Sequence, residues 1–127
     1  MATEDEINPI TERVIGAAIE VHRSLGPGLL ESAYSACLCH ELGLQGVSVE
    51  RERLLPVVYR GIIVDCAYRL DLVVENLVIV ELKAVSELAP IHEAQLLSYL
   101  KLSGCPVGLL INFNVRSLRL GLKRVSL

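Results

Sequence analysis

The sequence predicts an α/β fold of the mixed (α+β) kind, with a central mixed sheet flanked by helices. Segments with apolar residues at helical spacing and short apolar runs of strand type follow one another along the chain. Their order, α-α-β-β-β-β-α-β-β, suits helices packed against a sheet. At 127 residues, 52% of them hydrophobic, the chain can bury one core. Residues 1–127 are therefore expected to form a single domain.

Two helices are predicted to open the fold. Asn8 followed by Pro9 is typical of a helix start, so residues 1–8 are expected to form a flexible N-terminus. An apolar stripe at helical spacing follows, made of Ile10, Val14, Ala17, Ala18 and Val21. The segment "LGPG" ends this helix, and a second helix is predicted over residues 29–42, closed by the next residue, a glycine.

Strand-type segments dominate the rest of the chain. Four of them precede the third helix, at residues 47–54, 56–59, 62–74 and 77–85. The third helix is predicted over residues 90–102, and two further strands are predicted at residues 107–112 and 118–125. Because the connection through the third helix is long, the strand near Val107 is expected to run parallel to the one near Ile79.

Composition narrows the class of protein. The net charge of −3 and the pI near 5.6 argue against a protein that coats nucleic acid through bulk charge. The basic tail "VRSLRLGLKRVSL" is either a solvated edge strand or a patch that contacts phosphates. No apolar run is long enough to span a bilayer, and the N-terminus does not resemble a secretory signal. A cytoplasmic protein without membrane association is expected.

Charged residues inside the apolar run "VIVELKAV" mark a candidate site. Side chains alternate along a strand, so Glu81 and Lys83 point to the same face. Upstream, Asp71 lies inside another strand-like run, "YRLDLVVE". Charged side chains rarely lie in such runs unless they are paired or bind something. If the two runs form a hairpin, the three charged groups converge on a small area.

The register of this hairpin decides whether the two acids meet. A two-residue turn at Glu75-Asn76 would pair Asp71 with Val80, whereas a three-residue connection pairs it with Glu81. We predict the three-residue connection, with Asn76 or a neighbour in the left-handed conformation. Directly opposed carboxylates repel each other unless a proton or a cation lies between them. We therefore also predict a divalent cation, Mg²⁺ or Mn²⁺.

Phosphodiester hydrolysis is the chemistry that this set of residues favours. A divalent metal held by carboxylates retains several waters and can turn one of them into a nucleophile. Lys83 would orient that water or stabilise the charge that grows on the phosphate. Spacing alone leaves an alternative of equal weight, an ion pair of Asp71 or Glu81 with Lys83 at the end of a sheet.

Three motifs carry a resemblance to a known family. Asp71 with "ELK" at residues 81–83 resembles the PD-(D/E)XK nuclease signature, with Leu70 in place of the proline. "GPGLLESAY" resembles the motif that names the GxxExxY protein family, a branch of that superfamily. "EAQLLSYLKLSG" resembles the QxxxY element of RecB-like nucleases, and "VGLLINFN" is similar to the strand that follows it. The resemblance covers residues 10–125 and implies a restriction-endonuclease-like core.

The resemblance also implies roles for residues outside the central motif. Glu31 would add a further carboxylate to the metal site, although an acid at helix position N3 is also favoured by the helix dipole. Tyr34 is either a phosphate contact or a buried ring with a satisfied hydroxyl group. Gln95 and Tyr99 would hold the substrate or the waters of the site.

The three histidines are weaker candidates for the metal site than the carboxylates. His22, near the end of the first helix, could bind a metal as a histidine does in some RecB-like sites. A helix C-terminus also favours histidine because of its dipole, and this structural role is preferred. His92 is expected to be a surface residue at the start of the third helix, and His40 is assigned to structure.

Taken together, these patterns predict a small Mg²⁺- or Mn²⁺-dependent nuclease. Its catalytic residues would be Asp71, Glu81 and Lys83, and its metal ligands would be Glu31, Asp71 and Glu81. DNA is favoured over RNA by the resemblance alone. The alternative is a non-catalytic nuclease-like module that binds nucleic acid or a protein partner. The acidic pI and the few aromatic residues favour a partner, a homodimer or a narrow substrate.

Overall fold

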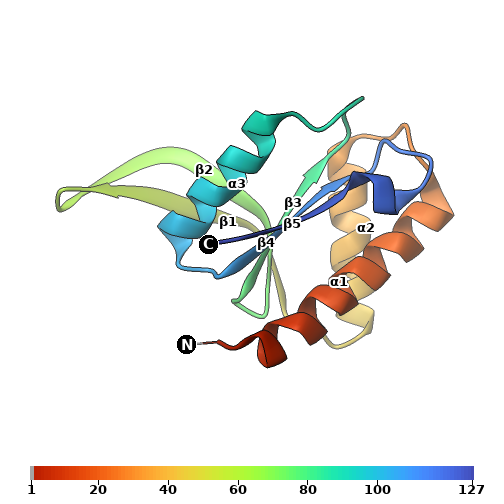
Figure 1. Cartoon of the computed structure of the whole chain (residues 1–127), viewed down its shortest axis with the longest axis horizontal. Coiled ribbons are helices and arrows are strands. Elements are labelled where there is room, and N and C mark those ends of the chain that lie inside the picture. The colour runs from red at the N-terminus through yellow and green to blue at the C-terminus, as the bar shows by residue number, and fades with distance from the viewer. Residues whose placement is uncertain (1) are drawn as a thin grey trace.

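Helices cover both faces of a five-stranded mixed sheet (Figure 1). The structure is a computed structural model that describes residues 2–127, except for the side chain of Ala67. In chain order the elements are α1 (Glu4–Leu25), α2 (Glu31–Leu44), β1 (Val49–Tyr59), β2 (Ile62–Val74), β3 (Val78–Lys83), α3 (Pro90–Ser103), β4 (Val107–Asn112), the 3-10 helix η1 (Leu118–Gly121) and β5 (Leu122–Ser126). The predicted α/β class with a mixed sheet is confirmed.

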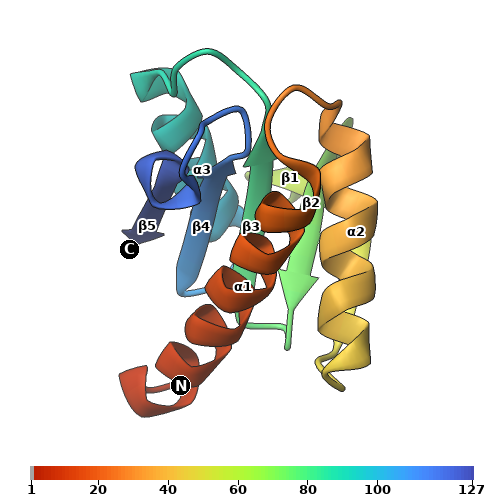
Figure 2. The same ribbon diagram turned by 90° about the vertical axis from the view of Figure 1, so that its right-hand side faces the viewer.

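The strands lie in the order β1-β2-β3-β4-β5. Neighbouring strands are antiparallel except β3 and β4, which are parallel, as predicted from the connection through α3. Every residue of β4 is buried, and so is every residue of β3 except Lys83. Continuous apolar runs therefore form the two central strands, because both of their faces are covered. The loops that follow α1, β3 and β4 gather at one end of the sheet (Figure 2).

Two separate cores lie on the two sides of the sheet. α1 and α2 pack on one side, over alternate residues of β2, β3 and β4 that include Leu72, Val80 and Leu109. α3 packs on the other side, where Leu96 lies over Gly108. A Cβ atom at Gly108 would lie 2.7 Å from the Leu96 side chain, so this glycine sets how closely α3 approaches the sheet. None of the helices in residues 2–127 combines the length and the apolar character needed to cross a membrane.

The first helix begins earlier than predicted. α1 starts at Glu4, with Thr3 in an extended conformation as its N-cap, and Pro9 lies inside the helix. Residues 4–8, which were expected to be a flexible N-terminus, therefore form the first turns of α1, and Ile7 is buried. Three acids in the first turn favour this earlier start, because the positive end of the helix dipole stabilises them. Met1 lies outside the described residues.

The predicted strands differ from the observed ones in number and in their ends. The predicted strands 47–54 and 56–59 are one strand, β1 (Val49–Tyr59), which reduces six predicted strands to five, and the register of β1 against β2 shifts between Leu55 and Val57. At this bulge Pro56 faces residues 65–67 of β2, and a proline that donates no hydrogen bond is tolerated at such a position. The predicted strand 77–85 is shorter, Val78–Lys83. The predicted last strand, residues 118–125, begins instead with the four residues of η1.

Beyond the bulge, β1 and β2 leave the rest of the sheet as a projecting hairpin (Figure 1). We call residues 56–67 the arm. No helix covers the arm in the structure, and Arg60 and Gly61 at its tip have positive φ angles, as a tight turn requires. Its exposed large hydrophobic residues are Val58, Tyr59, Ile62, Ile63 and Val64.

Gly121 gives a direct test of the packing between η1 and β4. A Cβ atom at this position would lie 2.2 Å from the backbone oxygen of Asn112, so the substitution Gly121→Ala forces the backbone to move. We expect Gly121→Ala to lower the free energy of unfolding by about 1–3 kcal/mol, measured by thermal or urea denaturation. Gly16→Ala is the matched control, since nothing lies within 4 Å of its added Cβ and Gly16 is in a helix. That control should be neutral or stabilising.

Candidate active site

Asp71 and Glu81 lie opposite each other where β2 and β3 separate. The paired residues Val74–Val78, Val73–Ile79 and Leu72–Val80 set the register, which places residue 71 across from residue 81. The connection consists of the three residues 75–77, and both Glu75 and Asn76 are left-handed, with φ angles of 53° and 57°. The predicted three-residue register is therefore confirmed.

The two carboxylates exchange hydrogen bonds with the opposite backbone. Glu81 Oε2 accepts a hydrogen bond of 2.8 Å from the N–H of Asp71. Asp71 Oδ2 accepts one of 2.8 Å from the N–H of Leu82. The ladder of paired residues ends one step earlier, at Leu72–Val80. Side-chain oxygens thus take the place of backbone carbonyls at this point, and both carboxylates are held between the strands.

At Asp71, the alternation of side chains along β2 is interrupted, so that Leu70 and Leu72 face opposite sides of the sheet. Leu70 belongs to the core under α3, whereas Leu72, two residues later, belongs to the core under α1 and α2. In a regular strand, residues two apart share a face. On β1, Glu52 lies opposite Asp71 and has a positive φ of 52°, which is uncommon for a residue other than glycine. Such backbone strain, together with the interrupted ladder, is typical of a functional site.

Burial gives both acids an unusual tendency to hold protons. Burial, followed by the charge of Asp71, raises the pKa of Glu81 to about 8, while the hydrogen bond from Asp71 and the charge of Lys83 lower it. Burial also raises the pKa of Asp71. The ion pairs of the described residues do not include Lys83, so a simple ion pair does not account for the group. The charge of Lys83 therefore does not offset the effect of burial on the pKa values of the two carboxyl groups.

Glu31 brings a third carboxylate to the same place. It is the first residue of α2, preceded by Leu30 as N-cap, and not the third as the sequence had suggested. Glu31 and Asp71 line one hollow of about 170 Å³, together with Ser32, Ser35, Arg51, Glu52 and Leu82. Glu31 also contributes to raising the pKa of Glu81. Three predicted metal ligands from α2, β2 and β3 are thus brought within electrostatic range of one another.

The carboxylate oxygens of the site are of the chemical type that binds a hard divalent cation. Oδ1 of Asp71 and Oε1 of Glu81 take part in neither of the two backbone hydrogen bonds. Carboxylate oxygens are the ligands that Mg²⁺ and Mn²⁺ prefer. In residues 2–127, however, no three His, Cys, Asp or Glu side chains form a ready-made metal-binding group. Binding of a metal would therefore require side-chain rotations, for which Glu31 on its helix end has room beside the hollow.

Tyr34 supports the site and does not face it. Its ring is fully buried and stacks on Phe113, with 4.5 Å between ring centroids. Its hydroxyl donates a hydrogen bond of 2.6 Å to the oxygen of Gly26 and accepts one of 3.1 Å from the N–H of Leu29. Of the two interpretations of Tyr34, the buried ring with a satisfied hydroxyl matches the structure. The residue fixes the loop that leads into Glu31.

α3 brings Tyr99 close to the acids. Tyr99 is buried, and its pKa is raised first by burial and then by the charges of Glu81, Tyr68 and Asp71. Gln95, one turn earlier in α3, is exposed. His92 is half-buried and has a structural role, since its Nδ1 accepts a hydrogen bond of 3.0 Å from the N–H of Ala89, the N-cap of α3.

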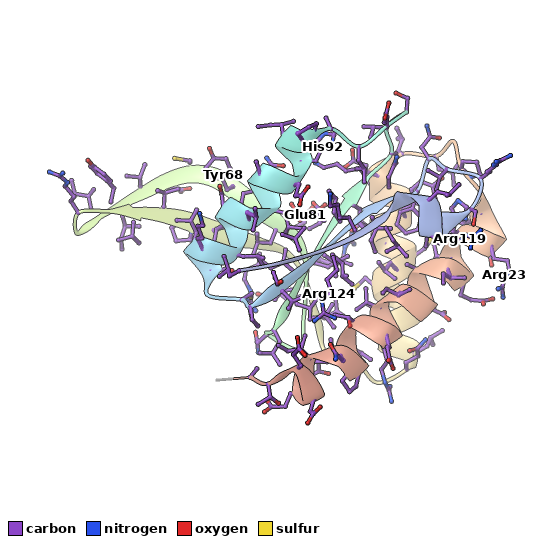
Figure 3. The ribbon with its side chains drawn as sticks, in the orientation of Figure 1. Arg23, Tyr68, Glu81, His92, Arg119 and Arg124 are labelled. Atoms are coloured by element: carbon purple, nitrogen blue, oxygen red, sulfur yellow. The ribbon has the colours of Figure 1, made fainter. Side chains whose placement is uncertain are left out.

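His22 is not brought to the acids. It is buried at the end of α1, and its Nε2 lies 2.6 Å from the backbone oxygen of Val115. It lines a different hollow, between α1 and the loop after β4. This hollow has about 330 Å³, and its lining includes three arginines and no acid: Ile19, His22, Arg23, Arg116, Ser117, Leu118 and Arg119. Figure 3 shows Arg23 and Arg119 near each other, with Glu81 closer to the centre of the molecule.

Two further residues of the site, Asn112 and Glu52, are not among the residues predicted from the sequence. Asn112 is buried at the end of β4, where its Nδ2 donates to the oxygen of Val85 and its Oδ1 accepts from the N–H groups of Val85 and Asn114. A polar residue that ends an apolar strand could have indicated this clamp. Glu52 is the second missed residue, and nothing in its neighbourhood in the sequence indicates a left-handed glutamate.

Comparison with known protein families agrees with this geometry. The chain matches the family described as the PD-(D/E)XK nuclease superfamily over residues 8–125. This protein therefore belongs to the PD-(D/E)XK nuclease superfamily, whose members generally use divalent metals such as Mg²⁺. No curated protein and no solved structure is significantly similar to the chain.

The raised pKa of Glu81 predicts how stability depends on pH without metal. Between its ordinary value of 4.5 and the folded value of about 8, the folded protein binds more protons than the unfolded chain. The free energy of unfolding in EDTA should therefore fall as the pH rises through this window, and the raised pKa of Asp71 acts in the same direction. Thermal denaturation across the window measures this. Glu81→Gln should flatten the dependence, whereas Glu12→Gln, at an exposed position of α1, should leave it unchanged.

Proposed function

We propose that this protein is a Mg²⁺- or Mn²⁺-dependent nuclease that hydrolyses phosphodiester bonds at the acids between β2 and β3. The observation that carries the proposal is the pair of carboxylates of half-buried Asp71 and buried Glu81, opposed across diverging strands with raised pKa values. Such a pair gains most from a divalent cation, because the cation relieves both the burial of charge and the mutual repulsion. Gly28, Glu31 and Tyr34 support assignment to the GxxExxY branch of the superfamily.

Each residue of the site has a part in the proposed reaction. Asp71, Glu81 and Glu31 would hold the metal through carboxylate oxygens. When bound, the metal supplies a more acidic water and draws charge from the phosphoryl oxygen. Lys83, on the same strand as Glu81 and without an ion-pair partner among the described residues, would stabilise the charge that develops on the phosphate or orient the water. Tyr99 and Gln95 of α3 would border the substrate.

Nucleic acid, DNA in the first place, is the proposed substrate. The hollow around Arg23, Arg116 and Arg119 offers arginines for the phosphates that flank the cleaved bond. It lies at the end of the sheet where the loops after β3 and β4 meet, and there the N–H of Phe113 donates a hydrogen bond of 2.9 Å to the oxygen of Lys83. A strand bound at this end of the sheet could therefore reach both the arginines and the acids.

A non-catalytic nuclease-like module is the second candidate. It is favoured by one observation, that residues 2–127 contain no three-ligand metal group in a binding arrangement. In that case, the protein would bind nucleic acid or a protein partner without hydrolysing a bond. The two candidates differ in whether the protein cleaves nucleic acid, and the nuclease proposal also requires that cleavage depend on Lys83.

Lys83→Ala tests the proposed reaction. We expect the wild type to cleave DNA in Mn²⁺ and to lose activity in EDTA. Removing the ammonium should reduce kcat by about 100- to 1,000-fold, as the loss of one charge-stabilising donor does in other enzymes. Cleavage of single- and double-stranded substrates measures the change.

Lys101→Ala is the matched control, because Lys101 is an exposed lysine in the last turn of α3. It should cleave like the wild type, and both variants should keep the wild-type melting temperature. No cleavage by either protein would contradict the nuclease proposal and support the binding module. Equal cleavage by Lys83→Ala and the wild type would contradict the proposed role of Lys83.

Salt dependence tests the arginine hollow. Each phosphate contact contributes about −0.7 to −0.9 to the slope of log K against log salt concentration. If Arg116 and Arg119 each contact a phosphate, the double variant Arg116→Ala/Arg119→Ala should flatten the slope by about 1.4–1.8 units, measured by fluorescence anisotropy. Arg13→Ala is the control. Arg13 lies about three helical turns from Arg23 on α1, away from the hollow, and donates a hydrogen bond to the backbone oxygen of Gln45. Arg13→Ala should leave the slope unchanged. A flattening of about 0.7–0.9 units, which is the same change per removed charge, would show that overall charge, and not the hollow, sets the slope.

A further inference from the structure

Tyr68 is an exposed aromatic ring at the base of the arm. It pairs with Leu55 across β1 and β2, and 43% of its surface is accessible. Its ring centroid lies 6.1 Å from that of Tyr99, with the two planes tilted by 54°. Figure 3 shows Tyr68 on the hairpin beside α3. One face or edge of the ring is thus supported by Tyr99, while the rest is open to solvent.

Tyr99 connects this ring to the acids. Apart from burial, the groups that raise the pKa of Tyr99 are Glu81, Tyr68 and Asp71, so all three lie within electrostatic range of its hydroxyl. Tyr99 is buried, and its position in α3 is fixed by the packing of its neighbours Leu96 and Leu100. The exposed ring of Tyr68 therefore lies one aromatic residue away from the proposed site of hydrolysis.

The other aromatic residues do not offer such a surface. The chain has four tyrosines, one phenylalanine and no tryptophan. Tyr34, Tyr99 and Phe113 are buried. Tyr59 is exposed, but it lies near the tip of the arm, where the guanidinium of Arg60 is 5.5 Å from its ring centroid. Among the described side chains, Tyr68 is accordingly the exposed aromatic ring that contacts Tyr99, the residue close to the acids.

We propose that Tyr68 is a stacking platform for one unpaired nucleobase beside the phosphodiester bond to be cleaved. This inference rests on the proposed nuclease function and names its substrate class: single-stranded nucleic acid, or a duplex with an unpaired nucleotide. Every base has a π face that can stack on an aromatic ring, but in a duplex neighbouring base pairs cover these faces. A single exposed ring accommodates one base, so the platform positions a nucleotide and does not bind a long strand tightly.

The experiment uses the full chain and a short single-stranded DNA that carries 2-aminopurine. Ca²⁺ replaces Mn²⁺ to allow binding without cleavage. Stacking on Tyr68 should quench the 2-aminopurine fluorescence. Tyr68→Ala should abolish this quenching and weaken binding about 5- to 100-fold, whereas Tyr68→Phe should retain both. Tyr59→Ala, which removes an exposed tyrosine from the same hairpin, is the matched control and should behave like the wild type.

Cleavage separates this inference from the proposed function. In Mn²⁺, the wild type should prefer single-stranded over double-stranded DNA, and Tyr68→Ala should lose that preference. Wild-type quenching without cleavage would contradict the nuclease proposal while supporting the platform. Cleavage with an unchanged preference in Tyr68→Ala would overturn the platform alone.

Two other results would also overturn the platform. The first is an equal loss of quenching in Tyr59→Ala, which would indicate unspecific contact along the arm. The second is a change of oligomeric state in Tyr68→Ala with no change in quenching, measured by sedimentation, which would make the ring part of a contact between two copies of the chain. A melting temperature equal to that of the wild type verifies that each variant is folded.

Discussion

The reciprocal hydrogen bonds between two side chains and two strands are the interaction on which the rest of the site depends. Glu81 accepts from the backbone of Asp71, and Asp71 accepts from the backbone of Leu82, so β2 and β3 separate without leaving these N–H groups unsatisfied. The same bonds keep Glu81 buried and Asp71 half-buried, and this burial disfavours the ionisation of both acids. The satisfied backbone N–H groups and the raised pKa values thus have one structural origin.

The surrounding elements keep this arrangement in place. Tyr34 joins the start of α2 to Phe113 after β4, and the ring of His22 at the end of α1 lies 6.2 Å from that of Phe113. Asn112 ties β4 to the segment after β3. Residues distant in sequence therefore form one packed unit behind the acids. Because its members are buried, the unit holds the start of α2, where Glu31 lies, from inside the core.

The sequence predicted what local patterns determine and missed what tertiary contacts determine. Alternation along the strands showed that Asp71 lies across from Glu81 only with a three-residue connection, and the structure has the connection that was predicted. The bulge at Pro56 was missed because one proline does not reveal that a strand continues beyond it. Glu52 could not have been predicted, because its left-handed backbone arises where β2 changes from one core to the other. The same limit applies to Tyr68, whose importance depends on α3.

Pro56 has a consequence for how this protein behaves in a crowded solution. β1 is an outermost strand of the sheet, and the arm, to which its last residues belong, carries exposed apolar residues. An exposed edge strand with such residues favours pairing with strands from other molecules. A proline has no N–H to donate, and the bulge around it bends the edge away from a regular template. The hairpin can therefore expose apolar side chains while Pro56 and the bulge disfavour pairing of β1 with strands of other molecules.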